Sequence, residues 1–368
     1  MHVHSLSLKN YRNYSSLELE LEPGINIFLG QNAQGKTNVM EAIYYASLGH
    51  SHRTRTDTEL ILWEQKEGYA RIAYERMGIL QVMELKFSRE ERRKIISNGQ
   101  QIPPKEMIGK IHTVLFSPED LFLIKGAPLG RRRFLDGEIS QASPSYYQSL
   151  LQYHRILSQR NTLLKSIRER KSSESMLDLW DVQLAETAAK ITRKRKDSIQ
   201  KLNRIAEMVQ GRISSQQEKL AVLYEMRGMD NGEMTNDLEA WYNNKLRAFR
   251  EKDILRGSTG IGPHHDDLVL EVNGINLRSF GSQGQQRTGA LALKLSELEF
   301  LRSETGEYPI LLLDDVMSEL DAARRRQLLD FICKEKIQTL VTATEEAYFP
   351  KERVGAYYEV SQGRIRKL

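Results

Sequence analysis

The hydrophobic positions divide the chain into two kinds of segment. Near both ends, apolar residues alternate with polar ones or form short uninterrupted runs, as in "HSLSLKNYR", "LELELEPG", "INIFLG", "PILLLDD" and "TLVTAT". Both patterns are typical of β-strands. Between residues 145 and 262 the chain has no proline, and most apolar residues recur at spacings of three, four or seven, which predicts helices.

We expect the middle segment to form a helical hairpin. The polar stretch "KSSES", residues 171–175, is the expected turn between its helices. The residues that share the apolar face of the first predicted helix are Leu150, Tyr153, Leu157, Leu164 and Ile167. Strands at both ends and helices between them predict an α/β fold: one domain made of residues 1–127 and 256–368, with a mainly helical, arm-like domain inserted at 128–255.

Length and composition restrict the class of protein. The 368 residues are 40% hydrophobic, enough for about two domains with buried cores. The apolar runs are too short for a membrane span, and the N-terminus is too polar for a signal peptide. The single cysteine, Cys333, excludes an intramolecular disulfide framework. We therefore expect a cytoplasmic protein.

Positive charge is concentrated in the predicted hairpin. The net charge is only +5, but residues 151–220 hold 15 Lys and Arg against 8 Asp and Glu. One dense spot is "RERK" at 168–171, and the other consists of Arg193, Lys194, Arg195 and Lys196. Either a solvated helix face or a contact with a nucleic-acid backbone explains such a run.

The segment "INIFLGQNAQGKTNVMEAIYYASLG" joins a predicted buried strand to an amphipathic helix through a glycine-containing loop. Its Gly-x4-Gly-Lys-Thr spacing is that of the P-loop, whose backbone N–H groups and helix N-terminus face phosphate oxygens. Lys36 is expected to reach the β- and γ-phosphates, and the Thr37 hydroxyl to bind Mg²⁺. We predict that a nucleoside triphosphate is held by Gly30, Gln31, Asn32, Ala33, Gln34, Gly35, Lys36, Thr37 and Asn38.

An acidic pair follows the apolar run "ILLL" at residues 310–313. Ligands of open α/β sheets bind at the carboxyl ends of the strands, so Asp314 and Asp315 are expected to face the nucleotide. Asp314 is the predicted partner of hydrated Mg²⁺, and Asp315 is placed to hold or deprotonate the attacking water. The alternative is that the two acids merely cap a helix start.

The stretch "FGSQGQQRTGALALKLSE", residues 280–297, has the residues of a second phosphate loop before a strongly helical segment. Ser282 can cap that helix, whose free N–H groups suit an anion. Two helix N-termini of one compact fold cannot easily wrap one γ-phosphate. A second copy of the chain can supply the second loop, so we predict a head-to-tail dimer that sandwiches two nucleotides.

The order of these motifs resembles that of the ABC-type ATPases of the SMC branch. Ser282 and Gly284, with Gln285 beside them, match the signature loop of that class. Asp314 matches its magnesium aspartate, and Asp321 its D-loop aspartate. The resemblance implies an ABC-type P-loop ATPase head with ATP and Mg²⁺ as cofactors.

Two positions near the predicted nucleotide depart from that class. Asp315 stands where a glutamate is usual, and because its side chain is one methylene shorter, we expect slow hydrolysis. Thr342 or Thr344 stands where the class keeps its switch histidine.

The chain resembles one family of that branch over nearly its whole length. The stretches "LKNYRNY", "SHRTRTD", "FSPEDLFLIKGAPLGRRRFLD", "GPHHDDL" and "SQGQQR" are together similar to the RecF family of bacterial recombination-repair ATPases. The resemblance implies an ATP-dependent homodimer that binds double-stranded DNA and favours junctions with single strands. It also implies action with RecR and RecO to direct RecA onto gapped DNA.

Several polar stretches have two interpretations. Arg53 and Arg55 lie where SMC-like ATPases keep a basic loop, so they contact nucleotide or DNA, or belong to a plain surface loop. The arginines of "RRRFLD", 131–136, either bind phosphates or pair with core acids. His265 stands where the family usually has arginine, and "HHDD" is a metal cluster or, as we expect, a loop before a strand. "FSPEDL", 116–121, occupies the place of the Q-loop, and we expect a helix start there.

Three other classes of protein are weighed against a DNA-binding ATPase. An SMC-like ATPase that acts on chromosomal DNA shares the same motifs. An ABC transporter ATPase subunit would have a shorter helical insert and the signature "LSGGQ", and the basic hairpin argues against it. A P-loop kinase would need no signature loop, so substitution of Ser282 would leave its activity unchanged.

Overall fold

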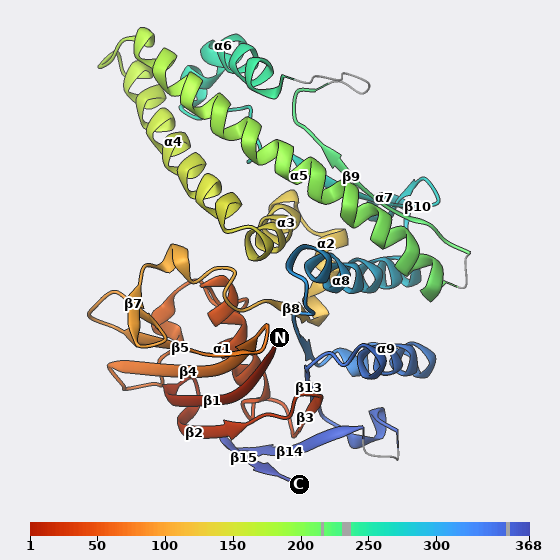
Figure 1. The fold of residues 1–368 in the computed structure, drawn as a ribbon. Coiled ribbons are helices and arrows are strands. Elements are labelled where there is room, and N and C mark those ends of the chain that lie inside the picture. The colour runs from red at the N-terminus through yellow and green to blue at the C-terminus, as the bar shows by residue number, and fades with distance from the viewer. Residues whose placement is uncertain (215–216, 230–236, 351–353) are drawn as a thin grey trace. The chain divides into compact units, whose positions relative to one another are not determined.

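The chain folds into two compact units, which are considered separately. One consists of residues 1–120 and 297–368, and the other of residues 121–296 (Figure 1). The computed structural model describes residues 1–214, 217–229, 237–350 and 354–368. None of the helices among these residues is long and apolar enough to cross a membrane.

The first unit contains an antiparallel sheet with the strand order β2-β1-β4-β5-β6-β7. Its strands are β1 His2–Tyr11, β2 Tyr14–Glu20, β4 Glu67–Arg76, β5 Ile79–Ser88, β6 Lys94–Ser97 and β7 Gln100–Ile102. Asn98 and Gly99, with φ values of 49° and 80°, make the turn between β6 and β7. Positive φ at both central residues is the requirement of a type I′ hairpin, for which Asn-Gly is a favoured sequence.

The second sheet of this unit has the order β15-β14-β3-β13-β12-β8, and only β15 is antiparallel to its neighbour. The bounds are β3 Ile25–Leu29, β8 Thr113–Phe116, β12 Ile310–Asp314, β13 Thr339–Ala343, β14 Gly355–Ser361 and β15 Arg364–Lys367. The strands predicted to be buried are so, since Ile27, Phe28 and residues 310–313 are fully buried. Parallel strands require helices on the faces of the sheet, which explains their continuous apolar runs.

Two α-helices of the first unit follow strands of the parallel sheet. Helix α1, Lys36–Leu48, follows β3, and helix α9, Ala322–Glu335, lies between β12 and β13. Short 3₁₀ turns occupy Asp57–Leu60, Pro104–Glu106, Pro118–Asp120, Val316–Ser318 and Glu346–Tyr348. The turn at Pro118 confirms the helix start expected in "FSPEDL"; the Ser117 N–H donates to the Asp120 carboxylate at 2.8 Å.

The second unit is mainly helical. Its elements are α2 Leu121–Lys125, α3 Pro128–Ala142, α4 Pro144–Arg168, α5 Leu177–Ile213, β9 Leu220–Glu225, α6 Leu238–Arg256, β10 Asp267–Val272, β11 Ile275–Asn276, α7 Leu277–Phe280 and the first part of α8 Gln283–Thr305. Helices α4 and α5 form the predicted hairpin, and the segment between them contains the expected turn and a 3₁₀ turn at Glu174–Met176. A second Asn-Gly hairpin, at Asn273-Gly274, joins β10 to β11, and "LRSF" after it is helical.

The borders of the units differ from the expected ones at 127/128 and 255/256. The structure places residues 121–127 and 256–296 with the inserted unit. The physical reason is strand pairing: β10 joins β9 along its whole length, from Asp267 opposite Glu225 to Val272 opposite Leu220. Strand β9 lies inside a stretch that was expected to be mostly helical, so this pairing was missed.

Candidate nucleotide site

The two glycines of the P-loop are required for different reasons. Gly30 packs against the backbone of β14, and a Cβ there would collide with the carbonyl oxygen of Val360. Gly35 has φ +111°, a left-handed conformation, and a Cβ would lie 2.6 Å from the Asn13 side chain. A residue with a Cβ would therefore be strained at Gly30 by the close approach alone, and at Gly35 by the close approach and the φ value together.

The Lys36 ammonium lies back over its own loop. Its Nζ donates to the carbonyl oxygens of Gly30 and Gln31, the second at 2.9 Å, and the residue is 7% exposed. Burial lowers the pKa of Lys36, while the carboxylates of Asp315 and Asp314 act in the opposite direction. The sequence-predicted lysine and both acids therefore belong to one electrostatic cluster.

Asp314 is joined to the P-loop helix by a hydroxyl. The Thr37 hydroxyl donates to Asp314 Oδ1 at 2.8 Å, and the Thr342 hydroxyl donates to the same oxygen at 2.8 Å. Strand β13, which carries Thr342, lies between β3 and β12, so the topology of the sheet brings the three residues together. A threonine hydroxyl and a carboxylate are hard oxygen donors of the kind that Mg²⁺ prefers, and this pair fits that ion.

Asp315 begins a turn rather than continuing the strand. Its φ is 56°, and its backbone N–H donates to the Thr342 hydroxyl at 2.9 Å. Burial raises the pKa of the Asp315 carboxyl, opposed by Lys36 and assisted by Asp314 and Glu319. A carboxyl with a raised pKa beside a phosphate loop is a reasonable proton acceptor for water.

A polar network around Glu41 of helix α1 was not predicted from the sequence. Arg12 donates to both oxygens of the buried Glu41 at 2.7 and 2.6 Å, and Ser51 donates to the same carboxylate. Burial alone would raise the pKa of Glu41, but these bonds bring it below its usual value. No short pattern in the sequence links these residues, because Arg12 and Glu41 are 29 positions apart.

Arg53 belongs to this network as well. Its Nη1 donates to Asn38 Oδ1 at 2.8 Å and lies 3.9 Å from the Glu41 carboxylate. Asn38 in turn donates to Asn13 Oδ1 at 2.8 Å, so the predicted basic loop reaches the first turn of α1. The side chain of Arg53 remains 45% exposed, and Arg55 is exposed too.

The Ser282 loop is a reciprocal cap at the start of α8. The Ser282 hydroxyl accepts from the Gln285 N–H at 3.2 Å, and the Gln285 side-chain oxygen accepts from the Ser282 N–H at 3.1 Å. This is the capping-box arrangement. Gln285 also donates to Glu218 at 3.1 Å, whereas Ser282, Gln283 and Gly284 are exposed.

Comparison with known proteins identifies the family. The family model described as RecF/RecN/SMC N terminal domain matches residues 2–365. A "DNA replication and repair protein RecF" of Listeria welshimeri is 41% identical over 370 aligned residues, covering all of both chains. The chain belongs to the RecF family. A RecF of Geobacillus kaustophilus is 45% identical and covers 99% of both chains.

Solved structures agree with this membership of the RecF family. A structure described as the recombination mediator protein RecF-ATPrS in the RecFOR pathway is 36% identical to this chain. It has a TM-score of 0.92 and covers 100% of this chain and 98% of its own. An Smc head domain derived from Pyrococcus furiosus, 15% identical with a TM-score of 0.56, covers 100% of this chain and 96% of its own and shares the fold. The predicted family and fold class are confirmed.

One basic residue predicted to bind DNA is instead part of the core of this RecF-family chain. Arg195 is 2% exposed, pairs with the Asp136 carboxylate at 2.8 Å and donates to the Pro263 carbonyl at 2.6 Å. A buried arginine held by a carboxylate cannot meet a phosphate backbone, so the expectation for Arg195 was wrong. Arg193 is exposed, and Lys194 and Lys196 are half-buried.

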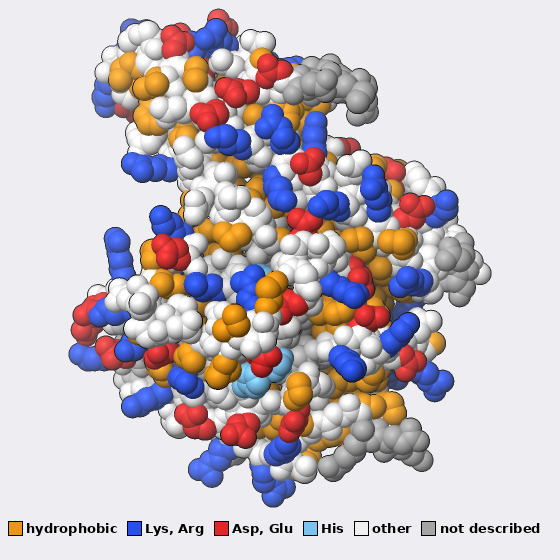
Figure 2. Space-filling model, in the orientation of Figure 1, with side chains coloured by type: hydrophobic (Ala, Val, Ile, Leu, Met, Phe, Trp, Pro, Cys, Tyr) orange, Lys and Arg blue, Asp and Glu red, His pale blue; other side chains and the backbone are white. Residues whose placement is uncertain are grey.

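The charged surface visible on one face of the molecule is mixed. On the face seen in Figure 2, Lys and Arg side chains over the helical unit are interspersed with acidic and apolar ones. In the stretch "RRRFLD", Arg131 pairs with an acid, the Asp267 carboxylate at 2.8 Å, which is one of the two interpretations of that stretch, and Arg132 donates to the backbone carbonyl of Asp266. Counting charge along the sequence could not separate such residues from solvated ones.

The "HHDD" stretch forms a hydrogen-bonded loop before β10. His264 lies 3.2 Å through Nε2 from the Thr259 carbonyl, so this nitrogen donates and Nδ1 accepts from the Tyr153 hydroxyl at 2.5 Å. Burial lowers the pKa of His264 to about 3, which keeps the ring neutral. Among the described residues, no group of ligands suited to a metal ion includes His264 or His265, and the expected loop is present.

Proposed function

We propose that this chain is an ATP-dependent, dimerising DNA-binding protein of recombinational repair. Its ATP-bound dimer would clamp duplex DNA near single-strand gaps. Full-length membership of the RecF family, whose relatives are described as DNA replication and repair proteins, provides the frame for the proposal. The observation that carries it is the contact between the P-loop helix and the end of β12: the hydroxyls of Thr37 and Thr342 both donate to Asp314 Oδ1.

ATP is the nucleotide we assign to the P-loop. The loop amides and Lys36 would hold its phosphates, and a solved structure described as RecF-ATP supports the choice. Thr37 and Asp314 would hold Mg²⁺, which would neutralise phosphate charge. Asp315 would orient or deprotonate the attacking water, and its short side chain would make hydrolysis slow, so that the protein acts as a switch.

The Ser282 loop is assigned to the nucleotide of a second copy. Its exposed hydroxyl and the N-terminus of the 23-residue helix α8 are suited to an anion that arrives from outside the unit. ATP would then be a shared ligand of two chains, and its hydrolysis would open the dimer. ATP can favour closure of the dimer only by the difference between its affinity for the dimer and its affinity for the monomer.

Duplex DNA, including its junctions with single strands, is the proposed macromolecular ligand, with RecR and RecO as partners in loading RecA. The name of the RecFOR pathway in the description of a related structure supports these partners. The candidate contacts to DNA phosphates are Arg193, Lys194, Lys196, Arg53 and Arg55. Arg195 is no longer a candidate, because it is buried. Such contacts give salt-sensitive affinity with little sequence preference.

Molar mass from light scattering tests the shared site. With Mg²⁺ and a slowly hydrolysed ATP analogue, the wild type should double in mass, and Ser282→Arg should stay monomeric while still binding the analogue. Ser175→Arg is the matched control, because it adds the same charge at another exposed serine of the same unit and should dimerise normally. If wild type and both variants remain monomeric, the assignment of the Ser282 loop is wrong.

The link between nucleotide and DNA has its own test. Binding of a gapped duplex should be tighter with the ATP analogue than with ADP, and DNA should in turn favour the dimer. Equal affinity for DNA with ATP, with ADP and without nucleotide would contradict the clamp.

A further inference from the structure

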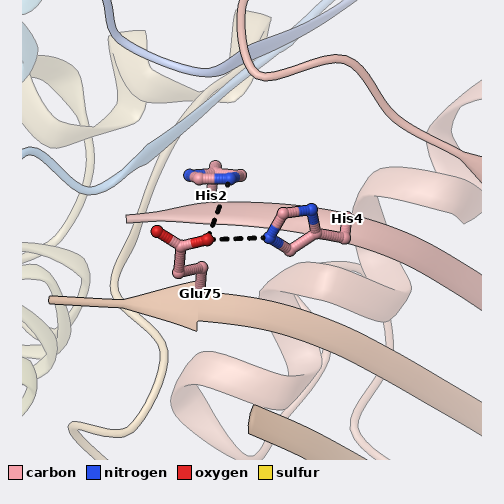
Figure 3. A group of neighbouring side chains, drawn as sticks. All are labelled: His2, His4 and Glu75. Carbon is pink, nitrogen blue, oxygen red and sulfur yellow. Dashed lines mark hydrogen bonds and ion pairs between the residues drawn. The ribbon is translucent and has the colours of Figure 1, made fainter. Parts of the chain in front are cut away.

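Two histidines at the start of β1 face one carboxylate on the neighbouring strand. His2 is paired in register with Glu75 of β4, and the register shifts between Val3 and Ser5, which leaves His4 as an additional residue. A bulge of this kind re-aims side chains. Both imidazoles are turned toward the Glu75 carboxylate (Figure 3).

The distances among the three side chains are close to those of a metal site. Glu75 Oε2 lies 3.2 Å from His4 Nε2 and 3.7 Å from His2 Nε2, and one ligand atom from each residue lies within 4.8 Å of the others. In a tetrahedral zinc site with bonds of about 2.0–2.2 Å, neighbouring ligand atoms are about 3.3–3.5 Å apart. Small rotations of the side chains are therefore enough to bring all three onto one ion.

The surroundings favour an ion at this position. The three side chains are 26%, 42% and 34% exposed, so that an ion can reach them from solvent and a water can complete its coordination. Among the described residues, the ion pairs of Glu75 are those to His2 and His4. The N-terminal ammonium and Arg76 are satisfied by a different carboxylate, that of Glu307, at 3.0 and 3.6 Å.

The environment of His2 agrees with this geometry. Burial, assisted by the neighbouring His4, lowers the pKa of His2. A neutral imidazole is the form that binds a metal ion. The ring centroids of the two histidines are 4.4 Å apart, a spacing that two protonated rings would oppose by repulsion.

We propose that His2, His4 and Glu75 bind one Zn²⁺ ion, with water in the fourth position. Two imidazoles and one carboxylate select zinc over Mg²⁺, which prefers oxygen ligands. The ion would tie the bulged end of β1 to β4 and stabilise the unit that carries the P-loop. This site shares no residue with the predicted Mg²⁺ ligands, Thr37 and Asp314, and does not depend on the proposed function.

Calorimetric titration with Zn²⁺ alone tests the site. The full chain is used without nucleotide and without an affinity tag, in a Cys333→Ser background that removes the exposed thiol. One ion should bind per chain. Loss of outer-shell partners of metal ligands costs 10–100-fold in affinity, so His4→Gln and Glu75→Gln should each weaken binding by about tenfold or more.

A matched control and a second measurement complete the design. His50→Gln removes an exposed histidine of the same unit and should bind Zn²⁺ like the parent chain. At the same Zn²⁺ concentration, the melting temperature of the parent and of this control should rise by more than that of His4→Gln. Substitution by Co²⁺ should give the visible absorption of a four-coordinate ion in the parent and the control only.

Two results would overturn the proposal. The first is equal Zn²⁺ affinity in the parent, His4→Gln and Glu75→Gln, which would place any bound ion elsewhere. The second is the absence of Zn²⁺ binding by the folded parent chain at neutral pH, which would leave the three side chains as a hydrogen-bonded group. Glu75→Gln keeps the assay decisive if His4→Gln fails to fold.

Discussion

The P-loop and the Ser282 loop contain similar residues but are held in different ways. In the P-loop, Gly30 and Gly35 are required by contacts within the same unit, with Val360 and Asn13 respectively. The Lys36 ammonium and the Thr37 hydroxyl are also bonded to groups of that unit. The geometry of this loop therefore follows from the packing around it.

The Ser282 loop has few such constraints. A Cβ at Gly284 would meet a neighbouring atom only at 3.9 Å, the Ser282 hydroxyl, and Gly284 is not among the residues with positive φ. Its main internal contact is the reciprocal cap with Gln285. The small, exposed residues of this loop are not needed for packing within their own unit. They agree with the proposal that a nucleotide bound to a second copy of the chain approaches the loop closely.

The largest expected difference between the loops concerns nucleotide affinity. Lys36→Met should weaken ATP binding by the monomer about 100-fold, near 2.7 kcal/mol, because the loop loses its cation. Ser282→Ala should leave the affinity of the monomer within about threefold. Fluorescent nucleotide titration at a concentration too low for dimers separates the two. Equal losses would mean that both loops bind the same nucleotide in one chain.

A pair of glycine substitutions tests the packing difference directly. Gly30→Ala should lower the free energy of unfolding by about 1–3 kcal/mol, because the added methyl group collides with the Val360 carbonyl. Gly284→Ala lies in the first turn of α8 and should change it by less than about 1 kcal/mol, in the stabilising direction. Urea unfolding followed by circular dichroism gives both values. A strongly destabilised Gly284→Ala would remove the contrast.

Thr342→Val probes the contacts that hold the strand-end acids beside the P-loop. The isosteric change removes the hydroxyl that donates to Asp314 and accepts the Asp315 N–H. A buried donor without a partner costs about 1–3 kcal/mol, so we expect a loss of stability near the lower end and roughly tenfold slower hydrolysis. Thr344→Val, at a half-buried position on the same segment, is the control and should behave like the wild type.

The smallest expected effect is a pH dependence of hydrolysis. The carboxylate form of Asp315 is the proposed base, and burial raises its pKa, while Lys36 opposes and Asp314 and Glu319 support the shift. Activity should therefore be full above this raised pKa and fall as the pH drops through it, earlier than for an ordinary aspartate. Single-turnover hydrolysis from pH 8 to 5, at unchanged circular dichroism, measures it. A flat profile would argue against Asp315 as the base.

Local signals in the sequence predicted local structure well. The P-loop, the Asn-Gly hairpins and the buried strands depend on residues within a few positions of each other, and each is present. Arg195 shows where this reasoning ends. Its run of four basic residues is typical of an exposed helix face. The groups that hold it in the core are distant in the sequence, since Asp136 lies 59 positions earlier and the Pro263 carbonyl 68 positions later.

The sequence by itself determined the local motifs of this protein: a P-loop pattern, an acidic strand end and a capped second loop, because each depends on residue type at short spacing. The tertiary structure decided which distant groups meet. It brought the hydroxyls of Thr37 and Thr342 to the same oxygen of Asp314 through the order of three strands, paired β10 with β9 in the inserted unit and brought Glu75 to His2 and His4. These contacts depend on strand order and register, which follow from packing of the whole sheet rather than from any short stretch.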